Sequence, residues 1–94
     1  MLFVYARCVV QKDRVEEFKA FATELVEKTR KEAGCVSYEL VQVTGKDDNL
    51  FAFVEKWENS EYLNIHANSE HFTTLIPKIS AFTELEIISH KVII

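Results

Sequence analysis

Residues 50–57 read Leu-Phe-Ala-Phe-Val-Glu-Lys-Trp, and this stretch decides the fold. It is rich in β-branched and aromatic side chains, which is typical of a strand. Because side chains alternate across a strand, Phe51, Phe53, Glu55 and Trp57 share one face, and residues 50, 52, 54 and 56 share the other. Both faces are largely apolar. Helices from so short a chain can cover one face only, so the second apolar face predicts a protein partner.

The flanking sequence predicts three more strands. Residues 36–43 are predicted to form a strand, which a polar turn around Gly45, residues 44–49, joins to the stretch above as a hairpin. The first ten residues are again β-branched and aromatic, and residues 85–94 close the chain in the same way. The first, third and fourth of these strands carry apolar side chains on both faces.

A long helix is expected between the first two strands. Asp13 stands three residues before Glu16, the spacing of a capping box, so Asp13 is the predicted N-cap. Apolar residues then recur at helical spacing with charged residues between them. Gly34 can adopt the left-handed conformation that ends a helix.

Two shorter helices are expected before the last strand. Asn59 offers an N-cap for a helix to about Ala67, and Ser69 can cap another that runs past Pro77 toward residue 82. Pro77 should kink this helix or mark its last turns. The order β-α-β-β-α-α-β predicts an α+β class, ferredoxin-like split βαβ fold with an antiparallel sheet, in a single domain over residues 1–94.

Composition excludes several classes of function. The chain has 94 residues, 15 acidic against 11 basic, and its Lys and Arg are scattered, so no nucleic-acid footprint is present. No apolar run reaches the roughly 18 residues of a membrane span, and no signal peptide is recognisable, which predicts a cytoplasmic protein. Cys8 and Cys35 lack metal-ligand spacing and are expected to be reduced thiols.

The residues that could carry chemistry follow the third strand. Glu55 and Trp57 share one face at its end, and the next helices present His66, His71 and Phe72. A few polar groups among apolar and aromatic walls are typical of a small-molecule pocket. A histidine near a carboxylate can act as a general base near neutral pH. The alternative is structural: Glu55 and His66 could form a hydrogen bond that joins helix to strand.

Other candidate sites are weaker. His66 and His71 are five residues apart with a predicted cap at Ser69 between them, unlike the spacing of four that aims two imidazoles at one ion, so no metal site is expected. No sequence motif for a cofactor is present. Arg7 interrupts an apolar strand and must reach solvent, an acidic partner or an anionic ligand, so Arg7 and Tyr5 are further candidates for substrate contact.

Three groups of residues are together typical of one family: Arg30, Glu32, Gly34, Cys35 and Tyr38; Glu55 and Trp57; His66, Ser69, His71 and Phe72. In these residues and their spacing the chain resembles the antibiotic biosynthesis monooxygenase (ABM) superfamily, especially its small quinol-monooxygenase-like members, over nearly its whole length. The resemblance implies a homodimer, a dimeric α+β barrel in which two four-stranded sheets pack face to face. Each subunit would keep its own pocket between sheet and helices.

The resemblance also implies an activity. Relatives oxygenate phenolic or quinol-type aromatics with molecular oxygen and without metal or flavin. Trp57 would form a wall of the pocket, and Glu55, His66 and His71 would supply the base or polar contacts. Haem degradation is disfavoured, because Arg7 and Ile76 stand where haem-degrading relatives have an asparagine and the histidine that ligates iron. A non-catalytic dimeric binding protein and an isomerase of a small oxygenated metabolite are the alternatives.

Overall fold

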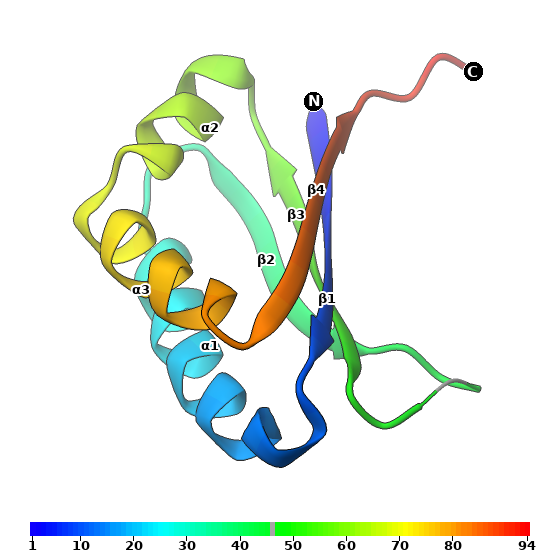
Figure 1. Cartoon of the computed structure of the whole chain (residues 1–94). Helices are drawn as coiled ribbons and strands as arrows, with labels where there is room; N and C mark the ends of the chain where they lie inside the picture. The colour runs from blue at the N-terminus through cyan, green and yellow to red at the C-terminus, as the bar shows by residue number, and fades with distance from the viewer. Residues whose placement is uncertain (46) are drawn as a thin grey trace.

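The computed structural model describes residues 1–45 and 47–94, and it forms one four-stranded antiparallel sheet with helices on one side (Figure 1). The strands lie in the order β2-β3-β1-β4. In chain order the elements are β1 (Leu2–Val10), a short 3-10 turn (Lys12–Arg14), α1 (Val15–Thr29), β2 (Cys35–Gln42), β3 (Leu50–Trp57), α2 (Ser60–Ala67), α3 (Glu70–Ser80) and β4 (Thr83–His90). The predicted ferredoxin-like α+β fold is confirmed.

The hydrophobic core lies between the sheet and the helices. Val4, Ala6 and Cys8 of β1 and Phe51 and Phe53 of β3 are buried there. The helices contribute Phe18, Ala22, Leu25, Leu75 and Ile79. No described element covers the opposite face of the sheet (Figure 1). This open face is the second apolar face that the sequence predicts.

The register of β1 divides the helix-facing side of the sheet into two ends. Val4 is paired with Glu55 of β3 and with Ser89 of β4, whereas Val10, at the other end of β1, is paired with Thr83. Glu55 therefore lies at the end of the sheet where β1 begins. The C-terminal half of α2 and the N-terminal half of α3 cover this end.

The predicted N-cap of the long helix is wrong. Asp13 lies inside the 3-10 turn, where the Arg14 amide donates to the Gln11 carbonyl at 2.9 Å, and α1 starts only at Val15 with no side-chain cap among the described residues. The helix also ends earlier than predicted, at Thr29. Gly34 does adopt a positive φ of 81°, but in the turn that leads into β2.

The caps of the later helices are confirmed. Asn59 accepts a hydrogen bond from the Tyr62 amide at the start of α2, and Ser69 accepts one from the Phe72 amide at the start of α3. Pro77 lies in the last turn of α3, as predicted. None of the helices in the described part of the chain is long and apolar enough to cross a membrane.

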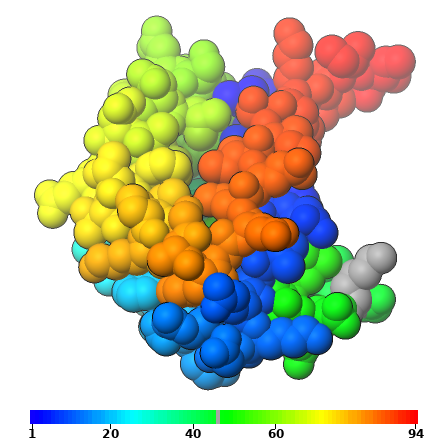
Figure 2. All heavy atoms as spheres, in the orientation of Figure 1, coloured from blue at the N-terminus to red at the C-terminus, as the bar shows by residue number. Residues whose placement is uncertain are grey.

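The last strand is shorter than predicted. β4 ends at His90, which is paired with Phe3, so only Leu2 of β1 lies beyond this pair and residues 91–94 find almost no partner strand. These residues project from the body of the molecule (Figure 2). In the β2–β3 turn Gly45 has a φ of 73°, and Lys46 lies outside the described residues.

Candidate functional site

A cavity of about 220 Å³ lies between the sheet and the helices α2 and α3. The sheet contributes Val4, Glu55, Ile87 and Ser89. The helices contribute Leu63, His66, Ala67 and Phe72. The walls are mainly apolar, and Glu55 and His66 are the two ionisable side chains on them, the composition expected of a small-molecule pocket.

Glu55 is a buried carboxyl, 4% exposed, on the helix-facing side of β3. Trp57 lies two residues further along the same face, and its Nε1–H donates to Glu55 Oε1 at 2.9 Å. Burial raises the pKa of Glu55 to about 7, against the opposing effect of the Trp57 hydrogen bond and with a smaller contribution from the charge of Glu32. Near neutral pH this side chain can therefore both accept and release a proton.

The His66 ring is held among aromatic side chains. Its centroid lies 4.8 Å from that of Trp57, 5.5 Å from that of Tyr38 and 5.0 Å from that of Phe72, which meets it edge-on. The side chain is 2% exposed, and burial lowers the pKa of His66 against the raising effect of Glu32. The neutral imidazole is thus the favoured form.

One carboxylate oxygen joins the two histidines of the helices. Glu32 Oε2, in the turn after α1, lies 2.6 Å from His66 Nδ1 and 2.8 Å from His71 Nε2. An ionised carboxylate only accepts hydrogen bonds, so His66 Nδ1 and His71 Nε2 each carry a hydrogen and donate it to Glu32. Glu32 therefore fixes the tautomer of His66, with Nδ1–H toward Glu32 and a lone pair on Nε2.

Gly34 allows Glu32 to reach the histidines. A Cβ at this position would overlap the Tyr62 ring of α2, and the backbone there has a positive φ. The Gly34 carbonyl also accepts from the Glu58 amide at 2.9 Å, just before α2. Glycine lets the turn and α2 approach closely, so that Glu32 meets His66 at the far end of the same helix.

Glu32, His66 and His71 are also the described residues whose donor atoms could surround a metal ion, since these atoms lie within 4.8 Å of one another. Metal–ligand bonds of about 2.0–2.1 Å place neighbouring ligand atoms about 3.0–3.4 Å apart. The two contacts of Glu32 Oε2, at 2.6 and 2.8 Å, are shorter and match charge-assisted hydrogen bonds. We therefore interpret this cluster as a hydrogen-bonded network.

The structure brings together some of the residues singled out from the sequence and separates others. Glu55, His66 and Phe72 line the cavity. Trp57 lies behind it, against Glu55 and His66, rather than on the lining. His71 also lies off the lining, at a surface hollow formed with α1. Tyr5 and Arg7 alternate with the buried residues of β1 and lie on the opposite face of the sheet.

The structural alternative, in which Glu55 hydrogen-bonds His66 or a backbone amide to join helix to strand, is not formed among the described residues. Glu55 binds Trp57 and His66 binds Glu32. Sequence reasoning placed Glu32 only among the residues typical of the family and gave it no role in the site. Only the fold shows that the turn after α1 meets the end of α2 and the start of α3.

The model of the family described as "Antibiotic biosynthesis monooxygenase" matches residues 1–78. The chain belongs to this family. Its match includes all of the cavity lining except Ile87 and Ser89. "Putative monooxygenase YcnE" of Bacillus subtilis is 31% identical over 78 residues, which cover 83% of this chain and 81% of that protein.

Other relatives support the assignment to the ABM family. "Uncharacterized protein sll1783" of Synechocystis is 35% identical over 69 residues, or 73% of this chain; the match spans about half, 46%, of that protein. A solved structure described as an antibiotic biosynthesis monooxygenase superposes over the whole of both chains with a TM-score of 0.92 at 34% identity. A conserved protein from Methanosarcina mazei gives 0.92 at 29% identity, covering 96% of this chain and 90% of that one.

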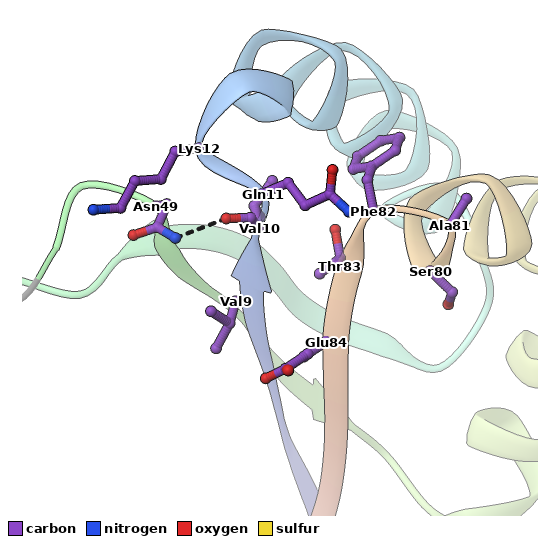
Figure 3. Close-up of a pocket in the computed structure, with 10 residues that line it drawn as sticks. All are labelled: Val9, Val10, Gln11, Lys12, Asn49, Ser80, Ala81, Phe82, Thr83 and Glu84. Carbon is purple, nitrogen blue, oxygen red and sulfur yellow. Dashed lines mark hydrogen bonds between the residues drawn. The ribbon is translucent and has the colours of Figure 1, made fainter.

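A larger hollow of about 510 Å³ lies at the other end of the sheet (Figure 3). Its charged residues, Lys12 and Glu84, come from different segments and their side chains lie apart, and Asn49 donates to the Val10 carbonyl at 2.7 Å. No pair of ionisable groups converges there. In this ABM protein the cavity at Glu55 is therefore the better candidate for chemistry, although it is smaller.

Proposed function

We propose that this ABM-family protein is a cofactor-independent monooxygenase that acts on a small phenolic or quinol-type aromatic, with Glu55 as the base that takes the phenolic proton. The observation that carries the proposal is a buried carboxyl with a pKa of about 7 on the wall of an apolar cavity. A base is most effective when its pKa lies near the working pH. Family membership supports the oxygenase class.

In the proposed chemistry the protein supplies one proton acceptor and a cavity that excludes water. Loss of the phenolic proton to Glu55 makes the aromatic ring electron-rich enough to reduce molecular oxygen itself. One oxygen atom then replaces a ring hydrogen to give a quinone. The other leaves as water, which takes up the phenolic proton and the ring proton. The cavity contributes by excluding water and by holding the ring against its apolar walls.

Glu55 suits the role of base better than the histidines do. Its Oε1 is held by Trp57, whereas no described residue binds Oε2. His66 Nε2 is enclosed and does not reach solvent in the ligand-free molecule, and His71 is off the cavity. We propose that His66 forms part of the cavity wall, and that Glu32 and His71 hold the His66 ring in place.

We also propose that the protein works as a homodimer through the open face of the sheet. That face carries apolar side chains on all four strands, and Val54 and Ile88 are 37% and 48% exposed. A stable interface buries on the order of 1,600 Å² in total. A second copy of the same sheet would supply a face of matching size and character.

Oxygen uptake measured with a panel of reduced quinones and simple phenols tests the activity. We expect uptake above the uncatalysed rate for at least one member and one labelled oxygen atom in its product when ¹⁸O₂ is supplied. Glu55→Gln should lower the rate by roughly 10²–10⁴-fold, because it keeps the shape but cannot take a proton. Glu27→Gln, an exposed change on α1 away from the cavity and from the open face of the sheet, is the matched control.

Two results would contradict the proposal. One is that no member of the panel consumes oxygen faster than in buffer alone; binding without uptake would then favour a binding protein. The other is uptake that Glu55→Gln leaves unchanged, which would remove Glu55 from the mechanism while retaining an oxygenase.

A further inference from the structure

His66 carries a buried hydrogen-bond acceptor with no partner. Three enclosed side-chain polar atoms of the described residues lack one: Thr29 Oγ1, Thr83 Oγ1 and His66 Nε2. Only His66 also lines the cavity that holds Glu55. Buried polar atoms are nearly always hydrogen-bonded in folded proteins, so such an exception at a cavity calls for an explanation.

The network around Glu32 decides which hydrogen bond this atom can make. Glu32 Oε2 accepts from His66 Nδ1 at 2.6 Å and is itself fixed by His71 Nε2 at 2.8 Å. With its one proton held at Nδ1, the neutral ring offers only a lone pair at Nε2. A hydroxyl or N–H group satisfies that atom, whereas an ether or carbonyl oxygen does not.

The two nitrogens of His66 have different surroundings. Glu32, which does not line the cavity, binds Nδ1, whereas His66 itself does line the cavity, so Nε2 is the polar atom of the ring that is left for a ligand there. Nε2 is enclosed, so a hydroxyl reaches it only if a side chain beside it moves. Phe72, half-buried and edge-on to His66 at 5.0 Å, is more exposed than the other two aromatic neighbours, Trp57 and Tyr38.

The volume of the cavity limits the size of the ligand. Its 220 Å³ exceeds the roughly 150 Å³ of an engineered cavity that binds benzene, and so holds one substituted ring. A single ring that reaches Glu55 with one hydroxyl leaves its other substituents facing the remaining walls. Among the described residues that line these walls, His66 is the only other ionisable group.

We infer that His66 is a specificity-determining residue whose Nε2 accepts a hydrogen bond from a second hydroxyl of the ligand, so that the cavity selects single-ring dihydroxyaromatics over monohydroxy analogues. This inference rests on the proposed function for the contact of the first hydroxyl with Glu55. Glu32 and His71 act through His66 as positioning residues, since they hold the tautomer that accepts.

Binding without turnover tests the inference. Trp57 is the only tryptophan of the chain and contacts both Glu55 and His66, so its fluorescence should report ligands in the cavity. Hydroquinone, resorcinol and catechol are each titrated against phenol, without oxygen and with a reductant. We expect at least one diol to bind about tenfold or more tightly than phenol, although its second hydroxyl makes it less apolar.

Two variants test whether the preference for diols over phenol depends on His66. His66→Phe keeps an aromatic ring and should bring the diol-to-phenol ratio to about one. Glu32→Gln, which releases the tautomer without touching the cavity, should reduce the ratio in a protein whose circular dichroism and melting show that it is folded. In ¹⁵N-histidine spectra of the wild type, the favoured diol should shift the Nε2 signal of His66, and phenol should not.

The outcomes separate this inference from the proposed function. A diol preference that depends on His66, in a protein that consumes no oxygen, supports the inference and removes the oxygenase. Equal affinities for diols and phenol, a ratio unchanged in both variants, or no binding of any probe overturns the inference, and oxygen uptake in the same preparation would leave the oxygenase standing.

Discussion

The two faces of the sheet are built from the same strands but treat polar groups differently. On the helix side Glu55 is buried beside an apolar cavity, Trp57 binds one of its oxygens, and no cationic side chain pairs with it in the part of the chain that the structure describes. On the open side the charged residues, among them Arg7 and Lys56, are exposed between apolar neighbours such as Val54. The first pattern perturbs a pKa, and the second leaves a surface that can associate.

This difference shows what strand alternation can and cannot predict about a residue. Alternation assigns each residue to a face, but it does not say whether a polar residue on that face is paired, enclosed or free. Glu55 has a perturbed pKa because helices α2 and α3 close over it. Arg7, on the same sheet, has no such cover and stays exposed.

The largest effect is expected from a charge at the centre of the open face. Val54 lies on an inner strand between Tyr5 and Glu39. In the proposed homodimer, Val54→Asp places two carboxylates in one apolar interface, and like-charge contacts there amount to several kcal/mol. We expect the dimer dissociation constant to rise by roughly 10³-fold or more. Sedimentation equilibrium should show a shift from twice 10.9 kDa to 10.9 kDa.

Ala20→Asp, on the exposed side of α1, is the control and should leave the mass unchanged. Circular dichroism must show that Val54→Asp is folded, because the new charge also faces Glu39. A wild-type protein that sediments as a monomer at micromolar concentration, or a folded Val54→Asp that remains dimeric, would exclude the proposed interface.

The next effect concerns the stability of the helix side as a function of pH. The pKa of Glu55 rises from about 4.5 in the unfolded chain to about 7 in the fold. The folded state therefore binds this proton more tightly, so the contribution of Glu55 to stability is greatest below pH 4.5 and is lost as the pH rises through 7. The difference corresponds to about 3 kcal/mol between pH 4 and pH 8.

Urea unfolding of the wild type and of Glu55→Gln at a series of pH values measures this term, since other titrating groups cancel in the difference. Glu55→Gln should gain about 3 kcal/mol relative to the wild type from pH 4 to pH 8. The proposed activity should rise over the pH range in which stability falls, because the base must be ionised. Parallel stability curves would show that Glu55 titrates normally.

Much of the fold follows from local sequence signals. Asn59 and Ser69 were recognisable as caps because each side chain acts within three residues of itself. The same signal is misleading at Asp13, which lies in a 3-10 turn that precedes the helix along the chain. The end of β4 depends on where β1 begins, which is a property of the pairing and not of residues 91–94.

The site was only partly predictable, because local sequence signals predict contacts between near neighbours in the chain but not contacts between distant residues. Glu55 and Trp57 are two residues apart on one strand, so their contact follows from alternation. The contact of Glu32 with His66 joins residues 34 positions apart through a close approach at Gly34. Periodicity in a single sequence carries no information on such a pair.

A smaller effect is expected from the hydrogen bond behind the cavity. Trp57→Phe keeps most of the apolar volume and should reduce stability by about 1–2 kcal/mol. It also removes the donor that lowers the pKa of Glu55, so that pKa should rise further and the pH of half-maximal oxygen uptake should move upward. Tyr38→Phe, a buried neighbour of Trp57, is the control and should move that pH less. An unchanged profile in Trp57→Phe would separate this bond from the titration of Glu55.

The smallest effect is expected from Arg7, the charged residue on the open face of β1. Its neighbours across the strands are Ala52 and Glu86, and the sheet itself separates it from the cavity. Arg7→Met should therefore change the affinity for hydroquinone, measured by Trp57 fluorescence, by less than about twofold, and the stability of the subunit by no more than about 0.5 kcal/mol. Tyr5→Phe, on the same face, should behave in the same way. A loss of affinity above tenfold in a variant with unchanged mass would mean that the open face takes part in ligand binding, and the assignment of the two faces to separate roles would fail.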